Sequence, residues 1–193
     1  MSSLFRYIAQ RDSMDCGSAC LSMIVEHYGI IINQDELRKN FETGKSGVSL
    51  LGISKAAEKI GIRTVGGMVS LHSLITEKPF PCIAHWDQNH FIVIYKIKKR
   101  RKGDCTIYVA DPGKGLLTYN KEEFCEHWAS TKTNGEEKGI VLLLEPTEKF
   151  YTQNSTKQTS KKYRLKFLWG YLRKYKRFFV QLILGLLLGS LLQ

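Results

Sequence analysis

The chain has 193 residues and a formal net charge of +11, and the positive charge is concentrated at one end. Nine of its 29 lysine and arginine residues lie in the segment 151–193, which has no aspartate or glutamate, so the first 150 residues carry 20 basic and 18 acidic side chains. This nearly neutral composition argues against a nucleic-acid-binding domain. The five cysteines are an odd number without a C-x-x-C pair, which argues against a disulfide framework and against a zinc site.

The sequence from Cys16 to Tyr28 has the spacing of a helix with one buried face. Asp15 is placed to cap this helix and Gly29 to follow its end, so Cys16 is expected in the first turn. Unpaired N–H groups and the helix dipole favour an anion there, which makes a thiol more nucleophilic. The alternative is a small core residue, which a cysteine at a helix start more often is. Cys16 is therefore a candidate nucleophile that needs partners elsewhere.

The remainder of the first 150 residues predicts more helices and a set of strands. Further helices are expected after the capping residues Asn33, Ser49 and Asn120. Short β-prone runs with turn signals between them predict strands at 62–65, 68–71, 82–86, 90–95, 105–110, 116–119 and 139–144. Helices in the first third, followed by strands that pair antiparallel, predict an α+β fold.

The sequence changes character after residue 148. A polar linker is expected at 149–162, a basic aromatic juxtamembrane segment at 163–177 and an almost wholly apolar run at 178–193. That run is shorter than the roughly 20 residues that span a bilayer as a helix, so it is interpreted as the start of a transmembrane helix. The basic residues before it favour a cytoplasmic location for the preceding domain.

Three further side chains could complete a site around the thiol. His90 opens a predicted strand at the mouth of a hairpin and is the candidate base, although most histidines are structural or solvated. If its strand pairs antiparallel with the strand that ends at Asp111, the carboxylate comes to lie beside the imidazole; the alternative is an ordinary turn aspartate. Gln10 could donate its amide to an oxyanion next to the Cys16 N–H, or be a surface glutamine.

The order of these residues, with a cysteine on an early helix and the histidine and aspartate on later strands, is the papain-like arrangement. The chain closely resembles the double-glycine leader peptidases, the N-terminal domains of bacterial peptidase-containing ABC transporters that process bacteriocins and related peptides. The resemblance extends from about residue 5 to residue 145 and rests on Gln10, Asp15-Cys16-Gly17-Ser18-Ala19-Cys20, His85-Trp86, His90-Phe91-Ile92-Val93 and Asp111-Pro112.

The resemblance implies a papain-like cysteine peptidase over residues 1–148, with the N-terminal helices packed on an antiparallel sheet. The implied activity is removal of the leader from a bacteriocin-like or other secreted precursor after a Gly-Gly type motif, coupled to ABC-transporter export. Cys16 would be the nucleophile, His90 the base, Asp111 the orienting residue and Gln10 the oxyanion donor. The expected partners are this precursor, the membrane and the transporter domains, and the expected location is the cytoplasmic face of the bacterial inner membrane.

No metal, cofactor or nucleic acid is expected. Gly44-Lys45-Ser46 does not complete a P-loop, because Lys39 stands where that motif requires a glycine, so no ATP site is predicted and no nucleotide-binding domain is present in the sequence. One alternative is a non-catalytic leader-docking domain that recruits substrate to an exporter, but docking requires neither Cys16 nor His90. A papain-like acyltransferase or another amide hydrolase is disfavoured only by the resemblance.

Overall fold

The computed structural model describes residues 5–41, 48–100, 104–133 and 136–153. Seven strands form one antiparallel sheet with helices packed against it, which confirms the predicted α+β class. None of the helices in these ranges is long and apolar enough to cross a membrane. The predicted juxtamembrane segment at 163–177 and the predicted start of a transmembrane helix at 178–193 lie outside the described residues.

Three helices lie in the first third of the chain, as predicted. They are α1 (Cys16–His27), α2 (Gln34–Arg38) and α3 (Leu50–Lys59). Asn33 and Ser49 cap α2 and α3, because their side chains accept hydrogen bonds from the backbone N–H groups of Asp35 and Gly52. The predicted cap of α1 is different: Asp15 occupies the N-cap position, but its side chain makes no capping hydrogen bond.

The sheet has the strand order β1-β7-β2-β3-β4-β5, and β6 pairs with the outer part of β7. The strands are β1 (Ile62–Ser70), β2 (Cys82–Trp86), β3 (His90–Lys99), β4 (Cys105–Asp111), β5 (Gly115–Tyr119), β6 (Thr131–Thr133) and β7 (Glu136–Pro146). β1 is one continuous strand where the sequence predicted two short runs. Its central glycines, Gly66 and Gly67, stay in the ladder opposite Leu142 and Val141 of β7, so they do not interrupt the pairing.

The remaining helices are α4 (Leu71–Glu77), α5 (Lys121–Trp128) and α6 (Glu148–Gln153). Only α5 was predicted, and Asn120 and Glu123 form its expected capping box. α4 and α6 are too short to have a helical repeat that the sequence could reveal. In α6 the Phe150 side chain is fully buried, so the folded domain reaches at least to Gln153, beyond the predicted boundary at residue 148.

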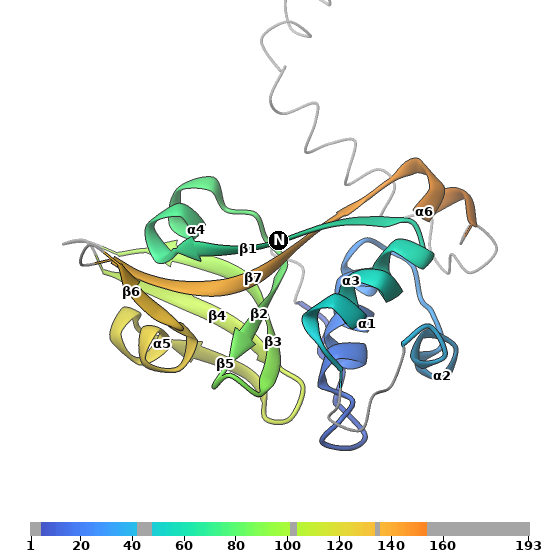
Figure 1. The fold of residues 1–193 in the computed structure, drawn as a ribbon, viewed down its shortest axis with the longest axis horizontal. Helices are drawn as coiled ribbons and strands as arrows, with labels where there is room; N and C mark the ends of the chain where they lie inside the picture. Colours follow the sequence, from blue (N-terminus) through green and yellow to red (C-terminus); the bar gives the residue numbers. More distant parts are fainter. Residues whose placement is uncertain (1–4, 42–47, 101–103, 134–135, 154–193) are drawn as a thin grey trace, which may run out of the picture. The chain divides into compact units, whose positions relative to one another are not determined.

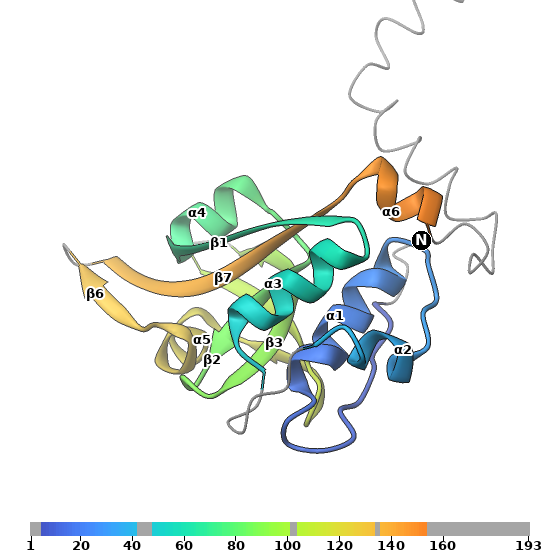
Figure 2. The same ribbon diagram turned by 45° about the vertical axis from the view of Figure 1, so that its right-hand side comes forward.

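Helices cover both faces of the sheet: the three N-terminal helices pack with α6 into one core, and α5, predicted after Asn120, packs with α4 into the other. Alternate residues of one strand serve two separate cores: in β3, Val93 packs into the core that contains α1, α3 and α6, whereas Ile92 packs into the core that contains α4 and α5. Figure 1 shows α1, α2 and α3 gathered on one side, with α4 and α5 on the other. Figure 2 shows α1 beside β3, and this neighbourhood brings together the residues of the candidate site.

Candidate active site

Cys16 is the first residue of α1, a helix that is buried over most of its length. All ten residues from Cys16 to Val25 are buried, and Cys16 itself is 5% exposed. Gly17 lets the start of α1 approach its neighbours closely, because a Cβ at this position would lie 2.9 Å from a side-chain carbon of Val48 and 3.0 Å from one of Ile53. The thiol is therefore held at a helix N-terminus by tight packing.

His90 and Asp111 lie side by side at the same end of two paired strands. His90 is the first residue of β3 and Asp111 the last of β4, and the antiparallel register places Val93 opposite Ala110. The His90 Nε2 atom lies 2.8 Å from Asp111 Oδ1. The side chain of His90 is 22% exposed and that of Asp111 is 2% exposed. The juxtaposition predicted from antiparallel pairing is therefore present, with the imidazole open on one side and the carboxylate enclosed.

The electrostatics of this pair favour a protonated imidazole. Burial acts to lower the pKa of His90, but hydrogen bonds to Asp111 and to Cys16, together with the charges of both groups, raise it to about 9. Burial acts to raise the pKa of Asp111, and it is outweighed by hydrogen bonds from His90 and the Gly113 N–H, so the pKa is lowered. Since Nε2 contacts the carboxylate, Nδ1 is the ring nitrogen that remains for the Cys16 thiol.

Gln10 reaches the same site through the turn that follows Asp111. The Gln10 backbone N–H and the Tyr7 hydroxyl both donate to the Pro112 carbonyl, each at 2.9 Å. A side chain at Gly113 would lie 3.6 Å from Gln10 Nε2 and 3.5 Å from Asp111 Oδ1, so both side chains border one small space. Gln10 Oε1 and Asp111 Oδ2 are buried and accept no hydrogen bond from the described residues. One turn thus holds both the predicted orienting residue and the predicted oxyanion donor.

The contacts that hold the site residues in place were not predicted from the sequence. The use of the Pro112 carbonyl depends on how the N-terminal segment crosses the β4–β5 turn, which no local pattern encodes. Arg38 of α2 lies 3.0 Å from Asp15, the residue immediately before the thiol, and this contact replaces the predicted capping role of Asp15. The two residues are separated by a complete helix and a loop, so their spacing gave no signal.

Cys20, one turn after Cys16, is in a different environment. It is fully buried, and its thiol donates to the Phe91 carbonyl at 3.3 Å. Burial, and then the charges of Cys16 and Asp111, raise the pKa of the Cys20 thiol well above its usual value. The environment of Cys20 is therefore that of a packing residue.

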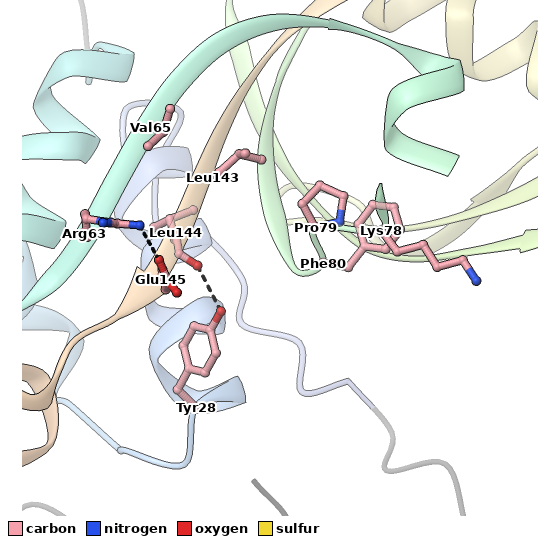
Figure 3. Close-up of a pocket in the computed structure, with 9 residues that line it drawn as sticks. All are labelled: Tyr28, Arg63, Val65, Lys78, Pro79, Phe80, Leu143, Leu144 and Glu145. Atoms are coloured by element: carbon pink, nitrogen blue, oxygen red, sulfur yellow. Dashed lines mark hydrogen bonds and ion pairs between the residues drawn. The ribbon is translucent and has the colours of Figure 1, made fainter. Parts of the chain in front are cut away.

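A pocket of about 390 Å³ lies elsewhere on the domain, and it is lined by β1, β7, the end of α1 and the segment before β2. Its lining is drawn in Figure 3 and consists of Tyr28, Arg63, Val65, Lys78, Pro79, Phe80, Leu143, Leu144 and Glu145. None of the four predicted site residues belongs to it. Across the described ranges, histidine, cysteine, aspartate and glutamate side chains form no group of three that could hold a metal ion.

A thiol at a helix start, an imidazole beside it and a buried carboxylate behind the imidazole form the type of site found in cysteine peptidases. The family comparison agrees with this class. The chain belongs to the peptidase C39 family, whose model matches residues 4–149.

Curated relatives include bacterial secretion and processing proteins. Over 153 residues the chain is 34% identical to the colicin V secretion/processing ATP-binding protein CvaB of Escherichia coli, an alignment that covers 79% of this chain and 19% of that protein. Over 150 residues it is 33% identical to the lactococcin-G-processing and transport ATP-binding protein LagD of Lactococcus lactis subsp. lactis, with 75% and 19% covered. The chain therefore spans about a fifth of the length of the curated relatives it matches.

Solved structures show the same fold. One is a double-glycine motif protease from an AMS/PCAT transporter in complex with the leader peptide, with a TM-score of 0.61 and 30% identity, covering 74% of this chain and 91% of that one. The peptidase domain of Streptococcus ComA, a bi-functional ABC transporter involved in a quorum-sensing pathway, also gives a TM-score of 0.61, at 24% identity, with 75% and 100% covered. At that identity the second match supports the fold alone.

Proposed function

We propose that this domain is a cysteine endopeptidase that removes the leader from a bacteriocin-like or other secreted peptide precursor after a Gly-Gly type motif. The observation that carries the proposal is the line of side chains from Cys16 through His90 to Asp111, in which the carboxylate holds the imidazole at 2.8 Å. The 30% identical double-glycine motif protease, solved with a leader peptide, supports the choice of substrate class. The proposal includes a papain-like arrangement of the α+β fold.

In this mechanism the residues act in two steps. The Cys16 sulfur, as thiolate, attacks the carbonyl carbon of the second glycine, and protonated His90 gives its proton to the leaving amine, so that the peptide bond breaks and a thioester with the leader forms. His90, now neutral, takes a proton from water, whose oxygen attacks the thioester and releases the leader acid and the Cys16 thiolate, so that the starting thiolate and protonated His90 are restored. Asp111 orients the ring throughout, and the Gln10 amide together with the Cys16 N–H stabilises the tetrahedral oxyanion.

The proposal is tested with a synthetic precursor that contains a double-glycine leader, and the products are identified by mass spectrometry. Cleavage immediately after the glycine pair by the wild-type protein, with no cleavage by Cys16→Ala, is the expected result. A matched precursor in which leucines replace both glycines should stay intact. Binding of the first precursor by wild-type protein without cleavage would instead favour the non-catalytic leader-docking domain.

Export and membrane attachment are a second part of the proposal. The names of the relatives combine processing with secretion or transport, which supports a precursor that an ABC transporter then exports. We propose that the segment 178–193 begins a transmembrane helix and places the peptidase on the cytoplasmic face of the membrane. Expression of residues 1–153 and of the full chain, followed by membrane fractionation, tests this: only the full chain should sediment with membranes. Sedimentation of both, or of neither, would contradict the proposed attachment.

A further inference from the structure

The five residues between Gln10 and Cys16 connect the proposed oxyanion donor to the proposed nucleophile. This connecting loop, residues 11–15, is not part of any helix or strand. The loop is held by its own turn contacts, by ion pairs to the short helix α2, and at Asp15, whose carbonyl accepts hydrogen bonds from the Ser18 hydroxyl and the Ala19 N–H of α1, each at 3.0 Å. A segment of this kind has little intrinsic rigidity, so its position depends on these contacts.

The ion pairs differ in their surroundings. Arg11 pairs with Asp35 of α2, but both side chains are more than half exposed, and exposed pairs contribute little. Arg38, at the end of α2, contacts two carboxylates of the loop with one nitrogen: Nη2 lies 3.3 Å from Asp12 Oδ2 and 3.0 Å from Asp15 Oδ1. The Asp15 side chain is only 10% exposed. Arg38 therefore neutralises a largely buried negative charge on the residue that precedes Cys16.

We propose that Arg38 is a positioning residue for the Cys16 thiol, acting through its ion pair with Asp15 at the start of α1. The proposal rests on the proposed peptidase function, because it assigns a role in that same site. It goes beyond that function by connecting α2, which contains none of the proposed reacting groups, to the alignment of the nucleophile.

The physical reason is the cost of an unpaired buried charge. Without Arg38, the Asp15 carboxylate must move toward solvent or take up a proton, since a buried ion that loses its partner is strongly unfavourable. Movement of Asp15 shifts the peptide unit that it shares with Cys16, and with it the thiol and the backbone N–H at the helix start. A misplacement of about 1 Å at a reacting group can lower a rate about a hundredfold. The predicted effect is therefore on turnover rather than on substrate binding.

The chain contains a matched control at the other end of the same helix. Arg6 Nε lies 2.9 Å from Glu26 Oε2, and the Glu26 side chain is 10% exposed, as is that of Asp15. Glu26 Oε2 accepts no hydrogen bond from the described residues, so charge alone holds this pair. Glu26 lies roughly 16 Å along α1 from Asp15, at about 1.5 Å per residue. Removal of Arg6 thus also leaves a largely buried carboxylate of α1 without its ion-pair partner, but far from the thiol.

The experiment compares Arg38→Gln, Asp15→Asn and Arg6→Gln with the wild-type full chain. Two readouts are used: kcat and KM on the double-glycine precursor, and the rate at which iodoacetamide alkylates Cys16, located by peptide mapping. We expect Arg38→Gln to lower kcat about 10- to 100-fold, with KM within about twofold, and to slow alkylation of Cys16 about tenfold. Arg6→Gln should leave both within about twofold of wild type while losing a similar amount of stability toward urea.

Asp15→Asn keeps the shape of the side chain and removes the charge that Arg38 holds. Because it leaves no unpaired buried charge, it should lower kcat less than Arg38→Gln does, and Arg38→Gln combined with Asp15→Asn should be no slower than Arg38→Gln alone. Independent, multiplying losses in the double variant would overturn the proposal. So would equal losses for Arg38→Gln and Arg6→Gln, a loss confined to KM, or failure of both Arg38→Gln and Asp15→Asn to fold.

The two readouts separate this inference from the proposed function. If the wild-type protein did not cleave the precursor, the proposed function would fail, whereas the alkylation rates of Cys16 would still decide whether Arg38 aligns the thiol. If the precursor were cleaved and alkylation of Cys16 were the same in wild type and Arg38→Gln, the positioning role alone would fail.

Discussion

The His90 ring is held on one side by a carboxylate and faces a thiol on the other. This environment raises its pKa to about 9, from an ordinary value of 6.5. The folded protein therefore binds this proton more tightly than the unfolded chain does. The resulting stabilisation is fully present below about pH 6.5 and is lost as the pH rises through about 9.

A pH profile follows from this pKa. If protonated His90 donates to the leaving amine, kcat/KM should fall as the pH rises through about 9. Asp111→Ala removes the hydrogen bond and the charge that raise the pKa, so the fall should move to lower pH and the maximum rate should drop. Asp111→Asn keeps an acceptor oxygen and should be milder. Rates measured from pH 5 to 10 decide this, and a profile of Asp111→Ala that matched the wild type in position and height would remove Asp111 from the site.

Gln10 has a different predicted signature. Because an oxyanion donor acts in the transition state, Gln10→Ala should lower kcat on the order of 10²–10³-fold with little change in KM. Steady-state kinetics on the double-glycine precursor measure both constants. The backbone hydrogen bond from Gln10 to Pro112 is retained in this variant, so its fold should be unchanged. Circular dichroism spectra of the variant and the wild type provide this control. A change in KM alone would make Gln10 a binding residue.

The two cysteines of α1 should respond oppositely to the same substitution. Cys16→Ala removes the proposed nucleophile and should abolish cleavage without preventing folding. Cys20→Ala removes a fully buried thiol and its hydrogen bond to Phe91, and should keep most activity while losing on the order of 1–2 kcal/mol of stability. Cleavage assays and urea unfolding provide the two measurements. Equal loss of turnover in both folded variants would contradict these roles.

At the scale of elements, the join between α3 and β1 depends on a glycine that contacts α6. Gly61 has φ +87°, a left-handed conformation, and a Cβ there would lie 2.5 Å from the Phe150 backbone nitrogen. The Gly61 carbonyl also accepts hydrogen bonds from the backbone N–H and the hydroxyl of Thr147. The end of the domain is thus fastened to the α3–β1 join at one residue.

Gly61→Ala should therefore destabilise the domain by about 2–4 kcal/mol, because backbone strain and a clash with α6 act together. Gly67→Ala is the matched control: Gly67 lies in β1, where a Cβ would meet nothing within 4 Å, and its effect should stay within about 0.5 kcal/mol. Urea midpoints at equal m-value measure the difference. Comparable stabilities for the two variants would contradict this prediction and would show that α6 can move away from residue 61 at little cost in stability.

For the whole domain, the C-terminal helix α6 is needed to complete the core that contains α1 and α3. Phe150 is fully buried in the core that contains α1, and its ring lies 6.4 Å from that of Tyr28 at an interplanar angle of 78°. Tyr28 in turn donates its hydroxyl to the Leu144 carbonyl at 3.0 Å. α6 therefore completes the core that contains α1, although it follows the last strand.

A shortened protein that ends at residue 153 should fold and cleave the precursor, whereas one that ends at residue 148 should be less stable by about 3–5 kcal/mol, the usual cost of losing a buried phenylalanine. Phe150→Ala in the longer protein should reproduce most of that loss. Urea unfolding of the three proteins provides the measurement. Equal stability of the proteins ending at 148 and 153 would mean that α6 does not contribute to the core.

The sequence by itself determined the elements with strong local signals and the residues that have chemistry. The helical repeat after Cys16, the caps Asn33, Ser49 and Asn120, and the hairpin around residues 87–89 all depend on neighbouring residues, and the structure has them. The adjacency of His90 and Asp111 needed only antiparallel pairing of two predicted strands.

Only the tertiary structure decided the features that join distant segments. The α4 and α6 helices are stabilised by packing rather than by a local repeat, and Gly66 and Gly67 remain in a strand because β7 pairs across them. Asp15 makes an ion pair with Arg38 instead of capping α1, because the packing of α2 places Arg38 Nη2 3.0 Å from Asp15 Oδ1. Burial and long-range pairing depend on which surfaces meet, and that information is distributed over the whole chain rather than carried by any one segment.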